Sequence, residues 1–223
     1  MATDPIDDPA IPGLLSRDRF STYLAATGGN QKQAVRLYAW NVAASSALWG
    51  DFNVLEVALR NSLSDQLAAA AGQVDWWNAA LPFHRFEITR LTQAVHDVAS
   101  QKGTSATPGH VVAELSLGFW TGLLGNKYHQ RLWVPILQHG FPQIIGTRRA
   151  LHTDLERLRR LRNRVAHHEP VFARNLAHDH ARTLAVLEMI CTPARAWVAR
   201  DSRIPAVLAD RQPTISGQIP TSF

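Results

Sequence analysis

The stretch RRALHTDLERLRRLRNRVAHHEP (residues 148–170) decides the fold class of this 223-residue chain. Its apolar residues recur every three or four positions. At about 100° per residue they form one stripe along a helix, made of Leu151, Leu155, Leu158, Leu161 and Val165. Thr147 precedes the stretch as a helix cap, and Pro170 must end the helix because the residue before a proline avoids helical geometry. The pattern predicts an amphipathic helix with one face against a core.

The rest of the chain shows the same helical spacing, from about residue 14 to about residue 200. No segment alternates between apolar and polar residues as a half-buried strand would. A second apolar stripe, which we expect to be buried, consists of Phe52, Leu55, Leu59, Leu63 and Leu67. Gly50 either breaks or only weakens the helix before it. We expect further helices over residues 84–101 and from Val111 to Leu124.

We therefore predict an all-α fold with one helical domain over residues 14–201. Residues 1–13 are expected to be a flexible N-terminus. Residues 202–223 contain Pro, Ser and Gln without helical spacing, which predicts a loose C-terminal tail.

Composition excludes several classes of protein. The chain is 46% apolar and 18% charged, which excludes wholesale disorder. No apolar run is long enough to cross a membrane. A lone cysteine, Cys191, excludes an internal disulfide and a cysteine zinc cage. The acidic N-terminal residues differ from a secretory signal, so we expect a cytoplasmic protein without a membrane partner.

The charge of the chain is concentrated in the decisive stretch. Residues 148–164 hold seven arginines against two acidic residues, an excess equal to the whole net charge of +5. A neutral scaffold with one basic helix points to a polyanionic partner, nucleic acid first. A solvated arginine face is the alternative.

Motifs of most enzyme classes are missing from the sequence. There is no Gly-rich phosphate loop and no Gly-x-Ser-x-Gly elbow, and the segment from His168 lacks the second histidine of a zinc-protease motif. His178 and His180 are two residues apart, so on a helix they point about 200° apart and cannot bind one ion. We expect these two to be surface histidines, and we predict no metal and no cofactor.

The end of the basic helix carries the remaining chemistry. Asn163 and His167 are four residues apart and lie together on its polar side, with Arg159 on the same row. Arg162 lies about 50° from the centre of the apolar stripe, so we expect it to be half-buried. A guanidinium there needs a carboxylate or a phosphate as partner.

This end of the helix resembles a known family. RNRVAH (162–167) is similar to the Arg-x4–6-His motif of the HEPN superfamily, and LRNRVAHHEP (161–170) resembles the signature of its Abi-like (abortive infection) proteins. Three further segments resemble that family in the same order along the chain: YAWN (38–41), LEVALRN (55–61) and ELSLGFW (114–120).

The resemblance implies a HEPN-like helical bundle with additional helices, which dimerises so that the two motifs meet. It implies a metal-independent endoribonuclease of phage-defence or toxin type, whose cleavage leaves a 2′,3′-cyclic phosphate. RNA and a second copy of the chain would be its partners, with an antitoxin or a phage-derived trigger. The catalytic residues carried over are Arg162, Asn163 and His167.

Other residues receive supporting roles. Glu56 and Arg60 lie in the family's signature helix, and Glu56 is the first choice to hold Arg162, with Glu114 second. His168 is a further supporting residue. The expected RNA-binding arginines are Arg159, Arg160 and Arg164.

Two other functions remain open. The chain could be a non-catalytic RNA-binding or regulatory HEPN module, with the arginine helix supplying phosphate contacts. It could also be a structural interaction protein whose helix end only seals an interface, because a histidine at a helix C-terminus is favoured by the helix dipole alone.

Overall fold

The computed structural model describes residue 6 and residues 10–223, and its described part is all-helical, without a strand. The all-α prediction is therefore confirmed. The helices are α1 (Ile11–Leu14), α2 (Arg17–Ala26), α3 (Gln31–Ala71), α4 (Arg85–Lys102), α5 (Pro108–Glu114), α6 (Leu117–Gly122), α7 (Arg148–Ala166), α8 (Leu176–Ile190), α9 (Thr192–Asp201), α10 (Ile204–Ala209) and α11 (Arg211–Ser216). Shorter helical turns cover Trp76–Asn78, Gly103–Ser105, Asn126–Tyr128, His129–Trp133 and Leu137–Gly140.

The chain divides into two compact units. The first comprises Met1–Asp51, Leu161–Ala181 and Asp201–Phe223, and the second comprises Phe52–Arg160 and Arg182–Arg200. The sequence predicted one domain over residues 14–201, and the division runs through that range. Most of the predicted flexible N-terminus, residues 1–13, lies outside the described residues, and its last residues belong to α1.

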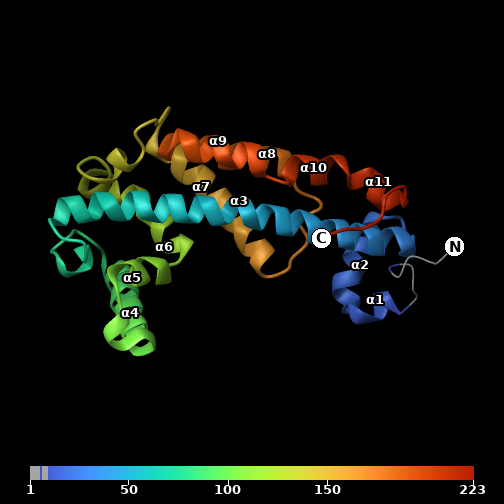
Figure 1. Ribbon diagram of the computed structural model, residues 1–223, viewed down its shortest axis with the longest axis horizontal. Coiled ribbons are helices and arrows are strands. Elements are labelled where there is room, and N and C mark those ends of the chain that lie inside the picture. The colour runs from blue at the N-terminus through green and yellow to red at the C-terminus, as the bar shows by residue number, and fades with distance from the viewer. Residues whose placement is uncertain (1–5, 7–9) are drawn as a thin grey trace. The chain divides into compact units, whose positions relative to one another are not determined.

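Several helices begin at capping residues that the sequence offers. Asn30 accepts a hydrogen bond from the backbone N–H of Gln33, 3.1 Å away, at the start of α3. Figure 1 shows α3 as one unbroken helix, which continues through Gly50. Glycine inside a helix costs about 1 kcal/mol relative to alanine. Burial of Leu48 and Phe52 on either side offsets that cost.

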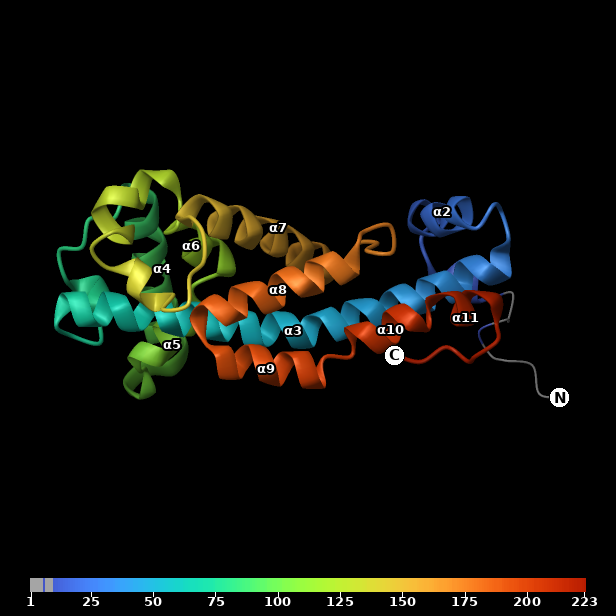
Figure 2. The same ribbon diagram turned by 90° about the horizontal axis from the view of Figure 1, so that it is seen from above.

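The core of the first unit forms around α2 and the first part of α3. Tyr23 is fully buried, and its ring centroid lies 5.3 Å from that of Tyr38 and 5.0 Å from that of Phe172. Trp40 of α3 donates a hydrogen bond from its indole Nε1 to the carbonyl oxygen of Val207, at 2.7 Å. Figures 1 and 2 both show α10 and α11 beside the first half of α3.

The prediction of a loose tail over residues 202–223 is wrong for residues 204–216. These residues form α10 and α11, and Ile204 and Val207 are buried. Each helix has only six residues, so neither is long enough to show a helical repeat in the sequence. These two helices are stabilised by burial of their apolar residues in the folded protein, which a repeating sequence pattern does not reveal.

The core of the second unit contains the predicted apolar stripe. Every residue of that stripe is at most 1% exposed: Phe52, Leu55, Leu59, Leu63 and Leu67. Trp76 is fully buried and donates a hydrogen bond from Nε1 to Ser64 Oγ, at 2.9 Å. The ring of Trp76 lies 6.0 Å from that of Trp120, which is also buried.

The predicted helix from Val111 to Leu124 is interrupted. Leu115 is extended, with ψ of 124°, and it separates α5 from α6. Ser116 then accepts a hydrogen bond from the backbone N–H of Phe119 at 3.3 Å, so a new helix begins. None of the described helices is both long and apolar enough to cross a membrane.

Candidate functional site

The candidate site lies at the C-terminal end of α7. Thr147 Oγ1 accepts a hydrogen bond from the backbone N–H of Ala150, at 3.2 Å, and so caps the start of this helix as predicted. The apolar stripe is at most 6% exposed: Leu151, Leu155, Leu158, Leu161 and Val165. The arginines of α7 therefore lie outside the buried face of the helix. From Leu161 onward the helix belongs to the first unit.

The helix ends earlier than the sequence predicted. Pro170 was expected to stop it, but α7 ends at Ala166 and His168 adopts a left-handed conformation, with φ of 55°. The N–H of Glu169 donates to the carbonyl of Arg164 at 2.8 Å, and the N–H of His168 donates to that of Val165 at 3.1 Å. This pair of bonds is the Schellman motif, whose left-handed position is usually a glycine.

The loop after α7 is held from two sides. Arg164 donates from Nη2 to the carbonyl of Pro170 at 3.1 Å, and its Nε lies 3.5 Å from Glu169 Oε2. Asn41, a buried residue of α3, accepts through Oδ1 from the N–H groups of Val171 and Phe172, at 2.7 and 3.1 Å. The backbone that carries the two histidines is therefore fixed on both sides.

Asn41 is a positioning residue that the sequence did not identify. It belongs to the YAWN segment, to which we assigned no individual role. A polar side chain among the buried residues of α3 was the available signal, because a buried amide must find hydrogen-bond partners.

Arg162 is half-buried, as its position on the helix predicts. Its guanidinium carbon lies 5.3 Å from the ring centroid of Trp49, a residue of α3 in the same unit. This distance is within the range of a cation–π contact. This contact could not be predicted from the sequence, because Trp49 follows a buried leucine and its spacing does not distinguish it from a core residue.

The remaining predicted catalytic residues share one row of the helix. The backbone N–H of His167 donates to the carbonyl of Asn163 at 2.9 Å, the last regular hydrogen bond of α7. Asn163 is half-buried, while His167 and His168 are exposed. Within the described part of the chain, neither imidazole has a hydrogen-bond partner.

The predicted RNA-binding arginines differ in how far they are already engaged. Arg159 donates to both carboxylate oxygens of Glu156, with Nε–Oε1 at 3.0 Å and Nη2–Oε2 at 2.8 Å. The hydrogen bonds from Arg159 lower the pKa of Glu156. Arg160 is exposed, and its Nε contacts only the backbone carbonyl of Glu156, at 3.2 Å. Arg164 is engaged with the loop, so Arg160 is the most accessible of the three.

Glu56 and Arg60 lie on α3 in the second unit and are half-buried, whereas Glu114 is exposed. The Nε atom of Arg60 is buried without a hydrogen bond in the described structure. The pairing of Glu56 with Arg162 stays a prediction, as does the supporting role of Arg60.

The two histidines of α8 have different environments. His178 is exposed, as predicted for a surface histidine. His180 is not at the surface: its side chain is 12% exposed, and Nδ1 lies 2.7 Å from Oδ2 of the buried Asp51. Both residues belong to the first unit. The described residues include no cluster of three His, Cys, Asp or Glu side chains that could hold a metal ion.

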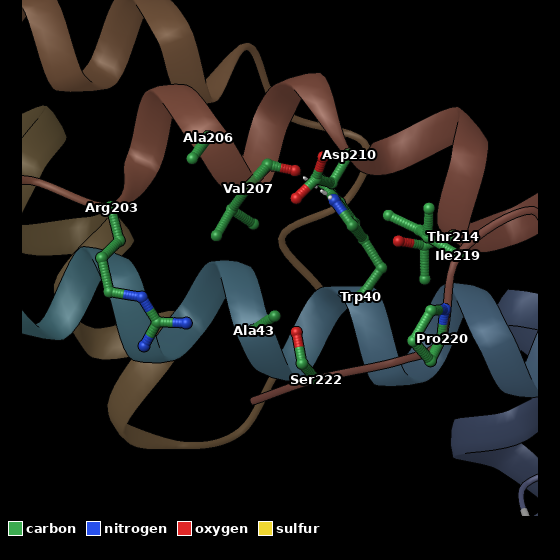
Figure 3. A pocket seen from close by; sticks show the side chains of 10 residues that line it. All are labelled: Trp40, Ala43, Arg203, Ala206, Val207, Asp210, Thr214, Ile219, Pro220 and Ser222. Atoms are coloured by element: carbon green, nitrogen blue, oxygen red, sulfur yellow. Dashed lines mark hydrogen bonds between the residues drawn. The ribbon is translucent and has the colours of Figure 1, made fainter.

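Figure 3 shows a cavity in the first unit, with a volume of about 120 Å³. Trp40 and Ala43 of α3 line one side, and Arg203, Val207 and Asp210 line the other. None of the predicted site residues contributes to its lining. The cavity is therefore separate from the candidate site at the end of α7.

Comparison with known proteins adds no assignment. No protein-family model matches the chain, and no curated protein or solved structure matches it either.

Proposed function

We propose that this protein is a metal-independent endoribonuclease of phage-defence or toxin type, related to the Abi-like proteins of the HEPN superfamily. The observation that carries the proposal is the end of α7, where a half-buried Arg162 and an exposed His167 share a helix end held by Asn41 and Arg164. A fixed cation beside an accessible imidazole suits phosphate chemistry, because catalytic groups must keep their geometry.

The proposed reaction is a transphosphorylation. One His167 accepts the proton of a ribose 2′-hydroxyl, whose oxygen attacks the adjacent phosphorus. A protonated imidazole, that of the partner's His167, gives its proton to the leaving 5′-oxygen. The products are a 2′,3′-cyclic phosphate and a free 5′-hydroxyl. A histidine suits either role near neutral pH because its ordinary pKa is about 6.5.

Two further side chains assist in this proposal. Arg162 holds the phosphate and offsets the charge that grows on its equatorial oxygens. Asn163, on the same row as His167, orients the imidazole or the phosphate. The RNA supplies its own nucleophile, so the reaction needs no serine, cysteine or metal.

We propose a homodimer as the active form, acting in the cytoplasm. One chain offers one Arg162 and one His167, whereas the reaction uses both a base and an acid. A two-fold axis beside residues 160–170 would bring together two copies of each. An antitoxin or a phage-derived trigger would then control the dimer.

A non-catalytic RNA-binding module is the second candidate. The exposure of Arg160 favours it, as does the absence, among the described residues, of a hydrogen-bond partner that would orient either imidazole. In that case RNA binding would persist without His167 and would weaken steeply with salt, because phosphate contacts release counterions.

The two candidates are separated by incubation of the purified protein with total RNA in the presence of EDTA. The proposal predicts cleavage by the wild type and by His178→Ala, a matched control that removes an exposed histidine from α8. It predicts no cleavage by His167→Ala. Binding without cleavage by the wild type would favour the binding module. Neither binding nor cleavage would favour a structural interaction protein.

A further inference from the structure

Trp49 and Trp197 are the two tryptophans of this chain whose side chains are exposed. The side chain of Trp49 is 44% exposed, whereas four other tryptophans are at most 6% exposed: Trp40, Trp76, Trp120 and Trp133. Its neighbour Leu48 is 1% exposed, so the backbone here is anchored while the indole reaches the surface. A rigid helix thus presents an aromatic ring to solvent.

The position of this ring connects it to the candidate site. The guanidinium carbon of Arg162 lies 5.3 Å from its centroid, and both residues belong to the first unit. The ring therefore helps to orient the guanidinium proposed to hold the scissile phosphate. The 44% of Trp49 that stays accessible leaves ring surface for a second planar group.

We propose that Trp49 is a stacking platform for a nucleobase of single-stranded RNA, next to the phosphate held by Arg162. This inference rests on the proposed ribonuclease function. In one nucleotide, a ribose joins the base to the phosphate, so these two groups lie close together. An aromatic ring and a guanidinium that are direct neighbours can therefore contact the base and the phosphate of the same nucleotide. Every base has a flat π-face, so stacking on an aromatic ring tolerates any sequence.

Single strands are the expected substrate because their bases are free to leave the stack. In an RNA duplex the bases are paired and stacked on one another, and a tryptophan on a helix surface cannot reach their faces. The platform therefore predicts cleavage in loops, bulges and unpaired ends.

The test compares binding of two probes in the His167→Ala background, where RNA stays intact. One probe is an oligoadenosine, and the other is an abasic oligoribose phosphate of equal length, which keeps the phosphates and 2′-hydroxyls. Trp49→Leu is expected to weaken binding of oligoadenosine about 10-fold more than binding of the abasic strand, because both strands lose the orientation of Arg162 but only oligoadenosine also loses a stacked base. Trp49→Phe, which keeps an aromatic ring, should weaken binding of oligoadenosine less than Trp49→Leu does. Trp197→Leu, a change at another exposed tryptophan, is the matched control.

Other outcomes would overturn the inference. If Trp49→Leu weakens binding of both probes equally, the ring serves only to hold Arg162. If it changes sedimentation but not RNA binding, the ring belongs to a protein interface. In both cases the ribonuclease proposal survives, provided that the wild type cleaves RNA. If the wild type neither binds nor cleaves RNA, both proposals fail together.

Discussion

His168 shows how one backbone angle shapes the candidate site. Among the described residues it is the one non-glycine with a positive φ. A side chain in this conformation costs about 1–2 kcal/mol, which surrounding structure must offset. The Schellman bonds and the contacts of Arg164 hold it there. Strain of this kind often accompanies functional positions, in keeping with a supporting role for His168.

Replacement of His168 by glycine should therefore stabilise the fold. We expect His168→Gly to raise the free energy of unfolding by about 0.5–1 kcal/mol, because glycine adopts the left-handed conformation freely. His178→Gly, inside the first turn of α8, should instead lower it by up to about 1 kcal/mol. Urea denaturation measures both changes. Equal destabilisation by the two variants would contradict the assigned backbone geometry.

Arg162 should not be replaceable by lysine. A guanidinium offers a planar fork to a phosphate, whereas an ammonium is a point charge. We expect Arg162→Lys to reduce the rate of RNA cleavage by about 10²–10³-fold, the usual cost of losing such a donor. Arg149→Lys, at an exposed position near the start of α7, should cleave like the wild type. If Arg162→Lys cleaved RNA at the wild-type rate, a positive charge alone, without the planar fork, would be enough to hold the phosphate.

At the level of elements, the site depends on the loop between α7 and α8. Val171 and Phe172 are buried, and both donate backbone N–H groups to Asn41 Oδ1. Asn41→Ala leaves two buried donors without an acceptor, which should destabilise the fold by about 2–4 kcal/mol. Hydrogen exchange should become faster over residues 167–173, and RNA cleavage should fall. Asn41→Asp keeps an acceptor oxygen and should therefore destabilise the fold less than Asn41→Ala does. Unchanged exchange in Asn41→Ala would contradict the positioning role.

Some helix starts were predictable from the sequence, whereas several ends and breaks were not. Asn30, Thr147 and Asn175 cap helices through local hydrogen bonds that a sequence pattern reveals. The extended Leu115 and the left-handed His168 carry no such signal. Both depend on tertiary contacts that override local preference.

The candidate site was predictable in part. Helical geometry was enough to predict that Arg162 is half-buried, because its angle to the apolar stripe is set by the helix alone. The contact with Trp49 joins α3 to α7 across more than 100 residues, and no local pattern contains it. The early end of α7 depends on the backbone of His168, which the sequence did not indicate either.

On the scale of the whole molecule, three of the four unit boundaries fall inside α3, α7 and α8. A sequence marks a domain boundary by a linker rich in proline, glycine or polar residues. No such segment lies at these positions, which explains why the sequence suggested one domain.

The assembly prediction also belongs to this scale. We expect a homodimer with residues 160–170 in or beside its two-fold interface, because the proposed reaction needs an acid and a base from identical surfaces. Sedimentation should show a dimer at tens of micromolar protein. A monomer under these conditions with intact ribonuclease activity would exclude the composite site.

The central claim is tested most directly by the chemistry of the cut ends. An RNA oligonucleotide cleaved in EDTA is analysed by mass spectrometry, beside the same oligonucleotide with a single 2′-deoxy substitution at the cut site. The proposed attack of the 2′-hydroxyl predicts a 2′,3′-cyclic phosphate from the first substrate and no cleavage of the second at that position. Dependence on a metal, or cleavage of the deoxy substrate at the same bond, would contradict it.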